Sequence, residues 1–80
     1  MKVKIITDMW CEYCTKAKSL LIQNDIAYEE LDLIDGIDLM EKYNLRTIPQ
    51  IFVDDKLIEG GYEGLVDLLK AKRLSEAWRV

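Results

Sequence analysis

The sequence predicts one α/β domain, in which a four-stranded mixed sheet carries helices on both faces in the order β-α-β-α-β-β-α. Short segments rich in Val, Ile, Leu and Phe alternate with segments whose apolar residues recur at helical spacing. The opening strand–helix–strand unit requires a parallel, right-handed crossover, and a late hairpin adds an antiparallel edge. Because 80 residues have room for a single core, we expect one domain over residues 1–80.

The first half of the chain predicts a strand, a helix and a second strand. Residues 2–7 alternate polar and apolar and then run apolar, as in a short buried strand. Residues 11–24 predict a helix, and residues 26–33 a strand with Leu31 and Leu33 on one face. One helical stripe comprises Cys14, Ala17, Lys18 and Leu21, and Leu20 widens it toward the core.

The second half predicts a short helix, a β-hairpin and a long last helix. A turn at Asp35-Gly36 leads into the short helix over residues 37–43. Strands over 50–53 and 56–59 flank a turn at Asp54-Asp55. After Gly60-Gly61, the last helix begins at Tyr62 or Glu63 and buries Leu65, Val66, Leu68 and Leu69. The charged tail continues this helix, and Lys72-Arg73 and Trp78 either close it or form a docking element.

Composition and charge exclude several function classes. Eleven Lys and Arg against fifteen Asp and Glu give a net charge of −4, which argues against nucleic acid or an anionic membrane as partner. The apolar runs are far shorter than the roughly 18 residues of a membrane span, and no signal peptide is recognisable. With no histidine, Ser–His triads and His-based metal sites are excluded. We therefore expect a soluble, cytoplasmic monomer.

The two cysteines form a Cys-x-x-Cys motif between the first strand and the first helix. Unpaired N–H groups and the positive end of the helix dipole stabilise a thiolate on Cys11, the form that attacks a disulfide. Cys14 lies one turn deeper, where it resolves the mixed disulfide. The alternatives are two inert buried thiols or half of a zinc knuckle. The strand–helix context favours redox chemistry, and the chain lacks the second ligand pair that zinc requires.

Three separated motifs resemble the glutaredoxins: Cys11-Glu12-Tyr13-Cys14, Thr47-Ile48-Pro49 leading into a strand, and Gly60-Gly61-Tyr62 before the last helix. The resemblance implies a thioredoxin fold and a dithiol oxidoreductase that reduces protein disulfides and glutathione mixed disulfides. It implies glutathione as co-substrate, no bound cofactor or metal, and ribonucleotide reductase as one partner class.

The resemblance also implies a substrate site. Pro49 is expected to be a cis-proline, or else an ordinary proline at the start of a strand. The family pattern assigns the glutathione or partner-disulfide site to Tyr13, Arg46, Thr47, Ile48, Pro49, Gly61, Tyr62, Glu63 and Gly64. In it, Thr47-Ile48 pairs with the cysteinyl part, Arg46 holds the glycine carboxylate, and the start of the last helix receives the γ-glutamyl carboxylate. The plainer alternatives are a solvated Arg46 and a merely packing Tyr13.

Departures from the family pattern keep other functions open. Asp8 stands where the family often has a cation, Glu12 replaces a proline, and Gly64 replaces a polar residue. The two carboxylates repel glutathione and oppose a thiolate on Cys11, which favours a thioredoxin-reductase-dependent redoxin as the alternative. Trp10 is either a groove wall or a redox determinant. Two further alternatives are an iron–sulfur module, with Cys11 of two chains and two glutathiones holding the cluster, and a redox-inert interaction domain.

Overall fold

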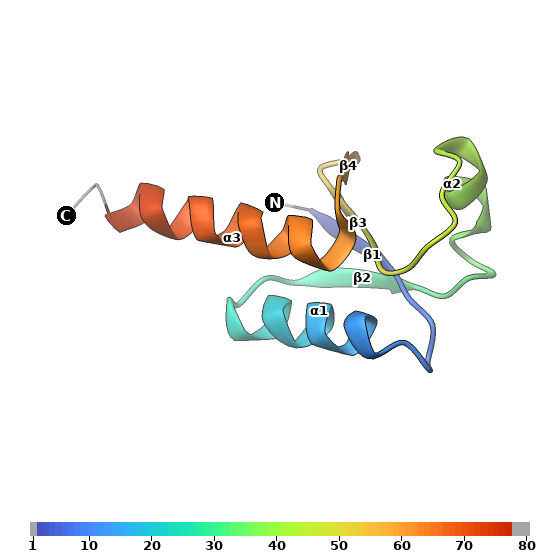
Figure 1. Cartoon of the computed structure of the whole chain (residues 1–80), viewed down its shortest axis with the longest axis horizontal. Coiled ribbons are helices and arrows are strands. Elements are labelled where there is room, and N and C mark those ends of the chain that lie inside the picture. The colour runs from blue at the N-terminus through green and yellow to red at the C-terminus, as the bar shows by residue number, and fades with distance from the viewer. Residues whose placement is uncertain (1, 78–80) are drawn as a thin grey trace.

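The structure, a computed structural model, describes residues 2–77 and the side chains of residues 2–71 (Figure 1). The described elements are β1 (Val3–Ile6), α1 (Glu12–Gln23), β2 (Tyr28–Leu31), α2 (Ile37–Lys42), β3 (Gln50–Val53), β4 (Lys56–Ile58) and α3 (Gly61–Ala77). The predicted element order is confirmed, and α3 begins one residue earlier than predicted. None of the helices within 2–77 combines the length and apolar character needed to cross a bilayer.

The predicted continuation of the last helix into the charged tail is confirmed as far as Ala77. Trp78 and the side chains of Lys72 and Arg73 lie outside the described residues, so nothing tests whether they close the helix or form a docking element.

The four strands form one mixed sheet in the order β2-β1-β3-β4. β1 is parallel to β2, with Val3 opposite Tyr28, and antiparallel to β3, with Ile6 opposite Gln50. β4 returns antiparallel to β3 through the predicted turn, where Asp54 and Asp55 both have positive φ. Two positive φ values in succession are typical of the primed turns that match strand twist in hairpins.

β2 is shorter than predicted, and the expectation that Leu31 and Leu33 share a strand face was wrong. The strand ends at Leu31, and Leu33 lies beyond it with 39% of its surface exposed. The physical reason is a turn at Asp32, whose carboxylate accepts the N–H of Asp35 and whose carbonyl accepts the N–H of Gly36. Short Asp side chains often form such local hydrogen bonds with the backbone, and these bonds compete with the hydrogen bonds of strand pairing.

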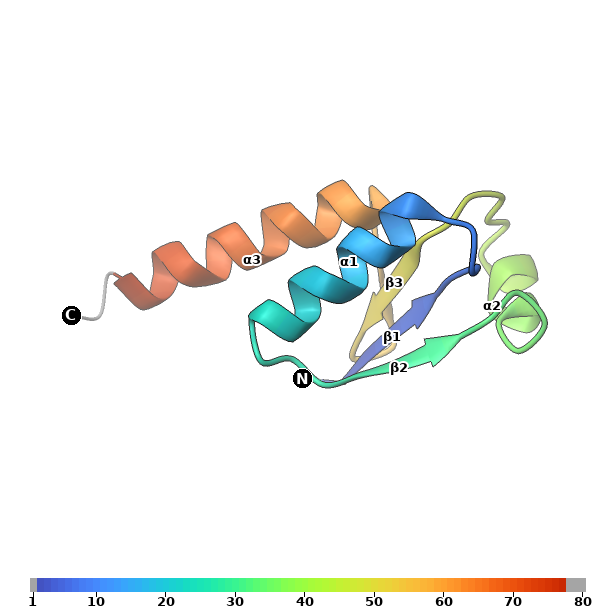
Figure 2. The ribbon, with the colours of Figure 1, turned by 90° about the horizontal axis from the view of Figure 1, so that it is seen from below.

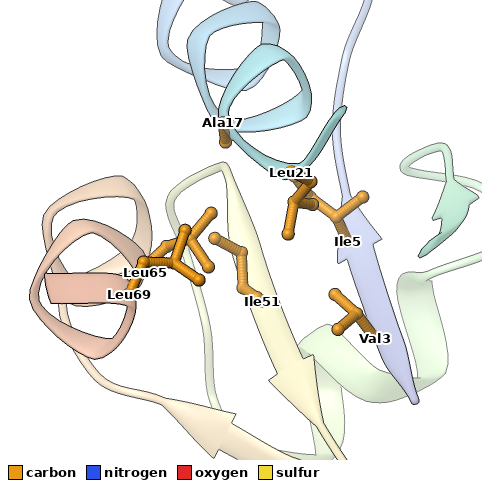
Figure 3. Close-up of a cluster of buried hydrophobic side chains, with 7 residues drawn as sticks. All are labelled: Val3, Ile5, Ala17, Leu21, Ile51, Leu65 and Leu69. Atoms are coloured by element: carbon orange, nitrogen blue, oxygen red, sulfur yellow. The ribbon is translucent and has the colours of Figure 1, made fainter. Parts of the chain in front are cut away.

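Buried side chains lie on both faces of the sheet, which confirms helices on both faces. Figure 3 shows the larger cluster, in which side chains from β1 and β3 meet those of α1 and α3. Its members are Val3, Ile5, Ala17, Leu21, Ile51, Leu65 and Leu69. On the other face, Ile6 and Phe52 pack with Met40 of α2. Strand alternation explains the division, because neighbouring residues such as Ile5 and Ile6 point to opposite faces.

The topology brings four connections between elements to one edge of the sheet. β1 ends there and leads to α1, β3 begins there, and β4 ends there and leads to α3. Because β2 is parallel to β1, its connection to α2 leaves from the same edge (Figure 2). Cys11, Pro49 and Gly61, which are far apart in the sequence, therefore approach one another.

An ion pair fastens α1 to this edge of the sheet. Lys18 Nζ of α1 lies 2.7 Å from Oε2 of Glu30 on β2, and the hydroxyl of Thr7 donates to the same oxygen at 2.7 Å. The Lys18 hydrogen bond, followed by that of Thr7, lowers the pKa of Glu30 below its ordinary 4.5. The Glu30 hydrogen bond raises the pKa of Lys18 above 10.5. Both shifts favour the charged forms in the folded state.

We predict that Glu30→Gln destabilises the protein in a pH-dependent manner. The folded-state pKa of Glu30 is lowered, so its stabilisation is present above the ordinary pKa of 4.5 and is lost as the pH falls through the folded value. Lys18 does not add to the loss of stability at acidic pH, because its raised pKa affects stability only above pH 10.5. Since the Glu30 side chain is 43% exposed, we expect a cost of about 0.5–1 kcal/mol at neutral pH.

Urea denaturation at neutral pH and at successive values below 4.5 measures this difference. Glu29→Gln removes the same charge at the exposed neighbouring position of β2 and serves as the control. A cost for Glu30→Gln that stays constant with pH would contradict the assignment.

We predict that Gly64→Ala destabilises the protein, although Gly→Ala within a helix normally stabilises it by about 0.5–1 kcal/mol. A Cβ at position 64 would overlap the backbone carbonyl oxygen of Glu59 and press against the Ile58 side chain. The overlap forces α3 away from β4, and we expect a loss of about 1–3 kcal/mol in the free energy of unfolding. Urea denaturation measures it, with Glu63→Ala at the exposed neighbouring position as control. A stabilised Gly64→Ala protein would show that this contact is absent.

Candidate active site

The two cysteines occupy different environments at the start of α1. Cys11 is the N-cap residue with extended backbone (φ −96°, ψ 113°), and its Sγ accepts the backbone N–H of Cys14 at 3.2 Å. Cys11 is half-buried, whereas Cys14 has no exposed surface. The structure thus places Cys14 as the more buried of the pair, on the same helical stripe as Ala17 and Leu21.

Burial holds Cys14 in its neutral form. Removal from water, the largest cause, and the hydrogen bond with Cys11 together raise the pKa of the Cys14 thiol to about 12. The positive charge of Lys18, one turn along α1, acts in the opposite direction. Near neutral pH, Cys14 is therefore a thiol and is shielded from solvent.

The loop before β3 lies against Cys11. The Ile48–Pro49 peptide bond is cis, as the sequence analysis expected. The thiol of Cys11 faces the carbonyl oxygen of Ile48, with Sγ and O 4.0 Å apart. This contact joins residues 37 positions apart and places the loop directly beside the sulfur.

Gln50 holds this loop, a role that the sequence analysis missed. Its side-chain amide donates to the carbonyl oxygen of Thr47 at 2.9 Å and to the Thr47 hydroxyl at 3.1 Å. Gln50 is only 8% exposed, although it opens an otherwise apolar strand. A polar residue at the head of such a strand is the signal that could have indicated a buried amide with a structural partner.

A groove of about 470 Å³ runs between the loop and the start of α3. It is lined by Tyr13, Thr47, Ile48, Pro49, Gln50, Gly60, Gly61, Tyr62 and Glu63. The rings of Tyr13 and Tyr62 are 5.9 Å apart, which joins the first turn of α1 to that of α3. Gly61 has φ +55°, and a Cβ there would lie 2.7 Å from the Pro49 carbonyl oxygen. Only glycine permits this close approach.

The groove brings together most, but not all, of the predicted substrate residues. Arg46 is exposed and does not line it, and Gly64 faces the Glu59 carbonyl instead. Trp10 is 88% exposed and is not part of the groove wall. The binding roles assigned to Arg46 and Gly64 stay predictions.

Asp8 and Glu12, the two acidic residues close to the candidate nucleophile in the sequence, each have a local partner. The carbonyl oxygen of Asp8 accepts the N–H of Cys11 at 3.3 Å, and the Asp8 carboxylate accepts the N–H of Met9 at 2.7 Å. Glu12 lies 4.0 Å from Lys16, whose Nζ also lies over the Tyr13 ring. Within the described residues, no group of three or more Cys, Asp or Glu side chains is arranged to hold a metal ion.

Comparisons with known proteins agree with this geometry. The glutaredoxin family model matches residues 3–58. Glutaredoxin 1 of Rickettsia bellii is 41% identical over 80 residues, covering 90% of this chain and 81% of that protein. Glutaredoxin 1 of Francisella tularensis, solved with cacodylate, has a TM-score of 0.73 at 31% identity and covers 94% of this chain and 96% of its own.

A buckwheat glutaredoxin–glutathione complex has a TM-score of 0.75 at 25% identity and covers 92% of this chain and 73% of its own. These structures have the thioredoxin fold expected from the sequence. Because the family model matches more than half of the residues, the chain belongs to the glutaredoxin family of thiol–disulfide oxidoreductases.

Proposed function

We propose that Cys11 is the attacking thiolate and Cys14 the resolving thiol of a dithiol mechanism. The observation that carries the proposal is the contrast between the two sulfurs. Cys11 has exposed surface, receives the Cys14 N–H at the helix start and faces Ile48 of the groove, whereas Cys14 is fully buried behind it. A helix N-terminus stabilises the negative charge on the attacking sulfur.

The proposed reaction transfers two electrons in two exchanges. Cys11 attacks one sulfur of a substrate disulfide and forms a mixed disulfide, while the bond between the substrate sulfurs breaks and the released thiolate takes a proton from solvent. Cys14 then loses its proton and attacks the Sγ of Cys11. The second substrate sulfur leaves as a thiolate and takes up the proton that Cys14 released, and the pair ends as the Cys11–Cys14 disulfide. Two glutathione thiols reduce this disulfide and become oxidised glutathione.

We propose that the groove binds glutathione, the co-substrate, and that no resident cofactor takes part. Support comes from Thr47 and Ile48, which line the groove, from the aromatic walls of Tyr13 and Tyr62, and from the helix N-terminus at Gly61, which favours an anion. The buckwheat relative was solved as a glutathione complex. Disulfide-bearing proteins are the proposed partners, with ribonucleotide reductase the specific one that the family resemblance suggests.

We further propose that the protein acts as a monomer in the cytoplasm. A dithiol that donates electrons must be returned to its reduced form, and the cytosol maintains thiols in that form.

We predict that Cys11→Ser abolishes reduction of every disulfide substrate, because the attacking sulfur is gone. Cys14→Ser should retain reduction of glutathione mixed disulfides, which need only Cys11 and free glutathione, and should slow reduction of protein disulfides by at least about tenfold. Coupled assays with a glutathione mixed disulfide and with a protein disulfide measure both activities. Urea denaturation checks that the buried Cys14→Ser protein is folded. Full activity of Cys11→Ser in either assay would refute the assigned roles.

We predict that Asp8→Asn speeds reduction of the oxidised protein by glutathione by about twofold to fivefold at low salt. The substitution removes a carboxylate near Cys11 that repels the glutathione carboxylates, while keeping an oxygen that can accept the Met9 N–H. Asp67→Asn, on the exposed side of α3, removes the same charge elsewhere and should have no effect.

The same assay decides the reductant. The oxidised protein is titrated separately with glutathione plus its reductase and with thioredoxin reductase, and the turnover rates are compared. Faster turnover with thioredoxin reductase, unaffected by Asp8→Asn, would contradict the proposed use of glutathione.

A further inference from the structure

A second groove lies on the other side of the loop that carries Cys11. Its volume is about 650 Å³, and its walls are the β1–α1 loop at residues 7–9 and the β2–α2 loop at residues 32–35. The Lys18–Glu30 ion pair lines it as well. β1 lies between β2 and β3 in the sheet (Figure 2). The loop after β1, which carries Cys11, therefore has the β2–α2 loop and this groove on one side, and the Pro49 loop and its groove on the other.

The second groove exposes large apolar side chains to water. Met9 on one wall is 81% exposed, Ile34 on the other is 82% exposed, and Leu33 beside it is 39% exposed. Trp10, which joins Met9 to Cys11 in the chain, is 88% exposed. Apolar side chains gathered next to a reactive sulfur are typical of an interaction surface, because a partner that covers them removes apolar area from water.

The charge of the groove is negative. Lys18 is engaged by Glu30, and the carboxylates of Asp8, Asp32 and Asp35 remain along the walls. Asp8 and Asp32 also accept backbone N–H groups of their own loops, at 2.7 Å each, which fixes both walls. The groove therefore presents apolar side chains with carboxylates at fixed positions, and its electrostatic complement is a cation next to an apolar group.

We propose that this groove docks a segment of the disulfide-bearing partner protein that carries an aliphatic side chain next to Lys or Arg. The occupant is a protein segment and not glutathione, since glutathione carries two carboxylates and one ammonium group and would be repelled. A docked segment brings its disulfide to Cys11 past Trp10, and the groove beside Pro49 stays available for glutathione. The inference rests on the proposed dithiol function and assigns its protein specificity to a second surface.

The test uses three cyclic peptides, each closed by one disulfide and identical except at two positions. The first carries Leu-Lys, the second Leu-Glu and the third Ser-Lys beside one cysteine. We expect the reduced protein to reduce the Leu-Lys peptide at least about fivefold faster than the other two at low ionic strength, with the Lys preference shrinking as salt is added. A small uncharged disulfide, measured in parallel, reports the reactivity of Cys11 alone.

A pair of matched variants locates the effect. Ile34→Ser combined with Asp35→Asn removes one apolar and one charged side chain of the groove, and we expect it to lose the preference for the Leu-Lys peptide. Ile22→Ser combined with Asp67→Asn makes the same change at exposed positions on α1 and α3 and should keep the preference. Urea denaturation confirms that both double variants are folded.

The outcomes separate this inference from the proposed function. If the wild-type protein reduces the small disulfide but treats the three peptides alike, or if the Ile34/Asp35 variant keeps the preference, the docking groove is refuted and the dithiol function stands. Failure to reduce even the small disulfide would refute the dithiol function itself. Sedimentation of the wild-type protein as a dimer and of the Ile34/Asp35 variant as a monomer would show that a second copy of the chain occupies the groove, and the proposal would be wrong.

Discussion

The antiparallel pairing of β1 with β3 is the constraint on which the site depends. With Ile6 opposite Gln50, the end of β1 leads to Cys11 at the point where β3 is entered from Pro49. The register also assigns side chains to faces, since Ile6 packs toward α2 while Ile5 packs toward α1 and α3. A slip of one residue would reverse these faces and move the loop away from the sulfur, so burial of the core and assembly of the site are enforced together.

The approach of α3 to the Pro49 loop follows from the same sheet. β4 returns antiparallel to β3, so the chain enters α3 at the edge where Pro49 lies. Gly61 then passes close to the Pro49 carbonyl, and Gly64 passes close to that of Glu59. Because glycine has no side chain, these two positions allow α3 to pack against two backbone segments at once. The space that remains beside Tyr62 is the groove.

Periodicity along the sequence predicted most of the fold because it reports which residues share a face. It placed Cys14 on the buried stripe of α1, and turn chemistry located the hairpin at Asp54-Asp55. Local spacing carries no information on how loops orient their side chains or on the lateral offset between elements. Thus the Thr47 hydrogen bonds of Gln50 and the pairing of Lys18 with Glu30 appeared only in the structure.

Family resemblance supplied the other expected site residues, and the structure places some of them in the groove and others outside it. It led to the cis peptide at Pro49, which the structure contains, and to Tyr13 and Tyr62, which line the groove. It also suggested Arg46, which the structure leaves exposed and outside the groove lining. The binding role of Arg46 therefore stays a prediction, because the structure fixes the backbone that the motif requires but not the position of a long, exposed side chain.

The causes of the high pKa of Cys14 bear on the order of the two proposed exchanges. Burial is the largest cause, but the hydrogen bond and the charge of Cys11 also contribute, and both belong to the reduced pair. Once Cys11 is bound in a mixed disulfide, its sulfur carries no negative charge, while the attraction of Lys18 persists. The pKa of Cys14 must then fall from its value of about 12 in the reduced protein. In the proposed mechanism, Cys14 is therefore held as an unreactive thiol until Cys11 has captured a substrate, and it becomes easier to deprotonate at the step in which it attacks.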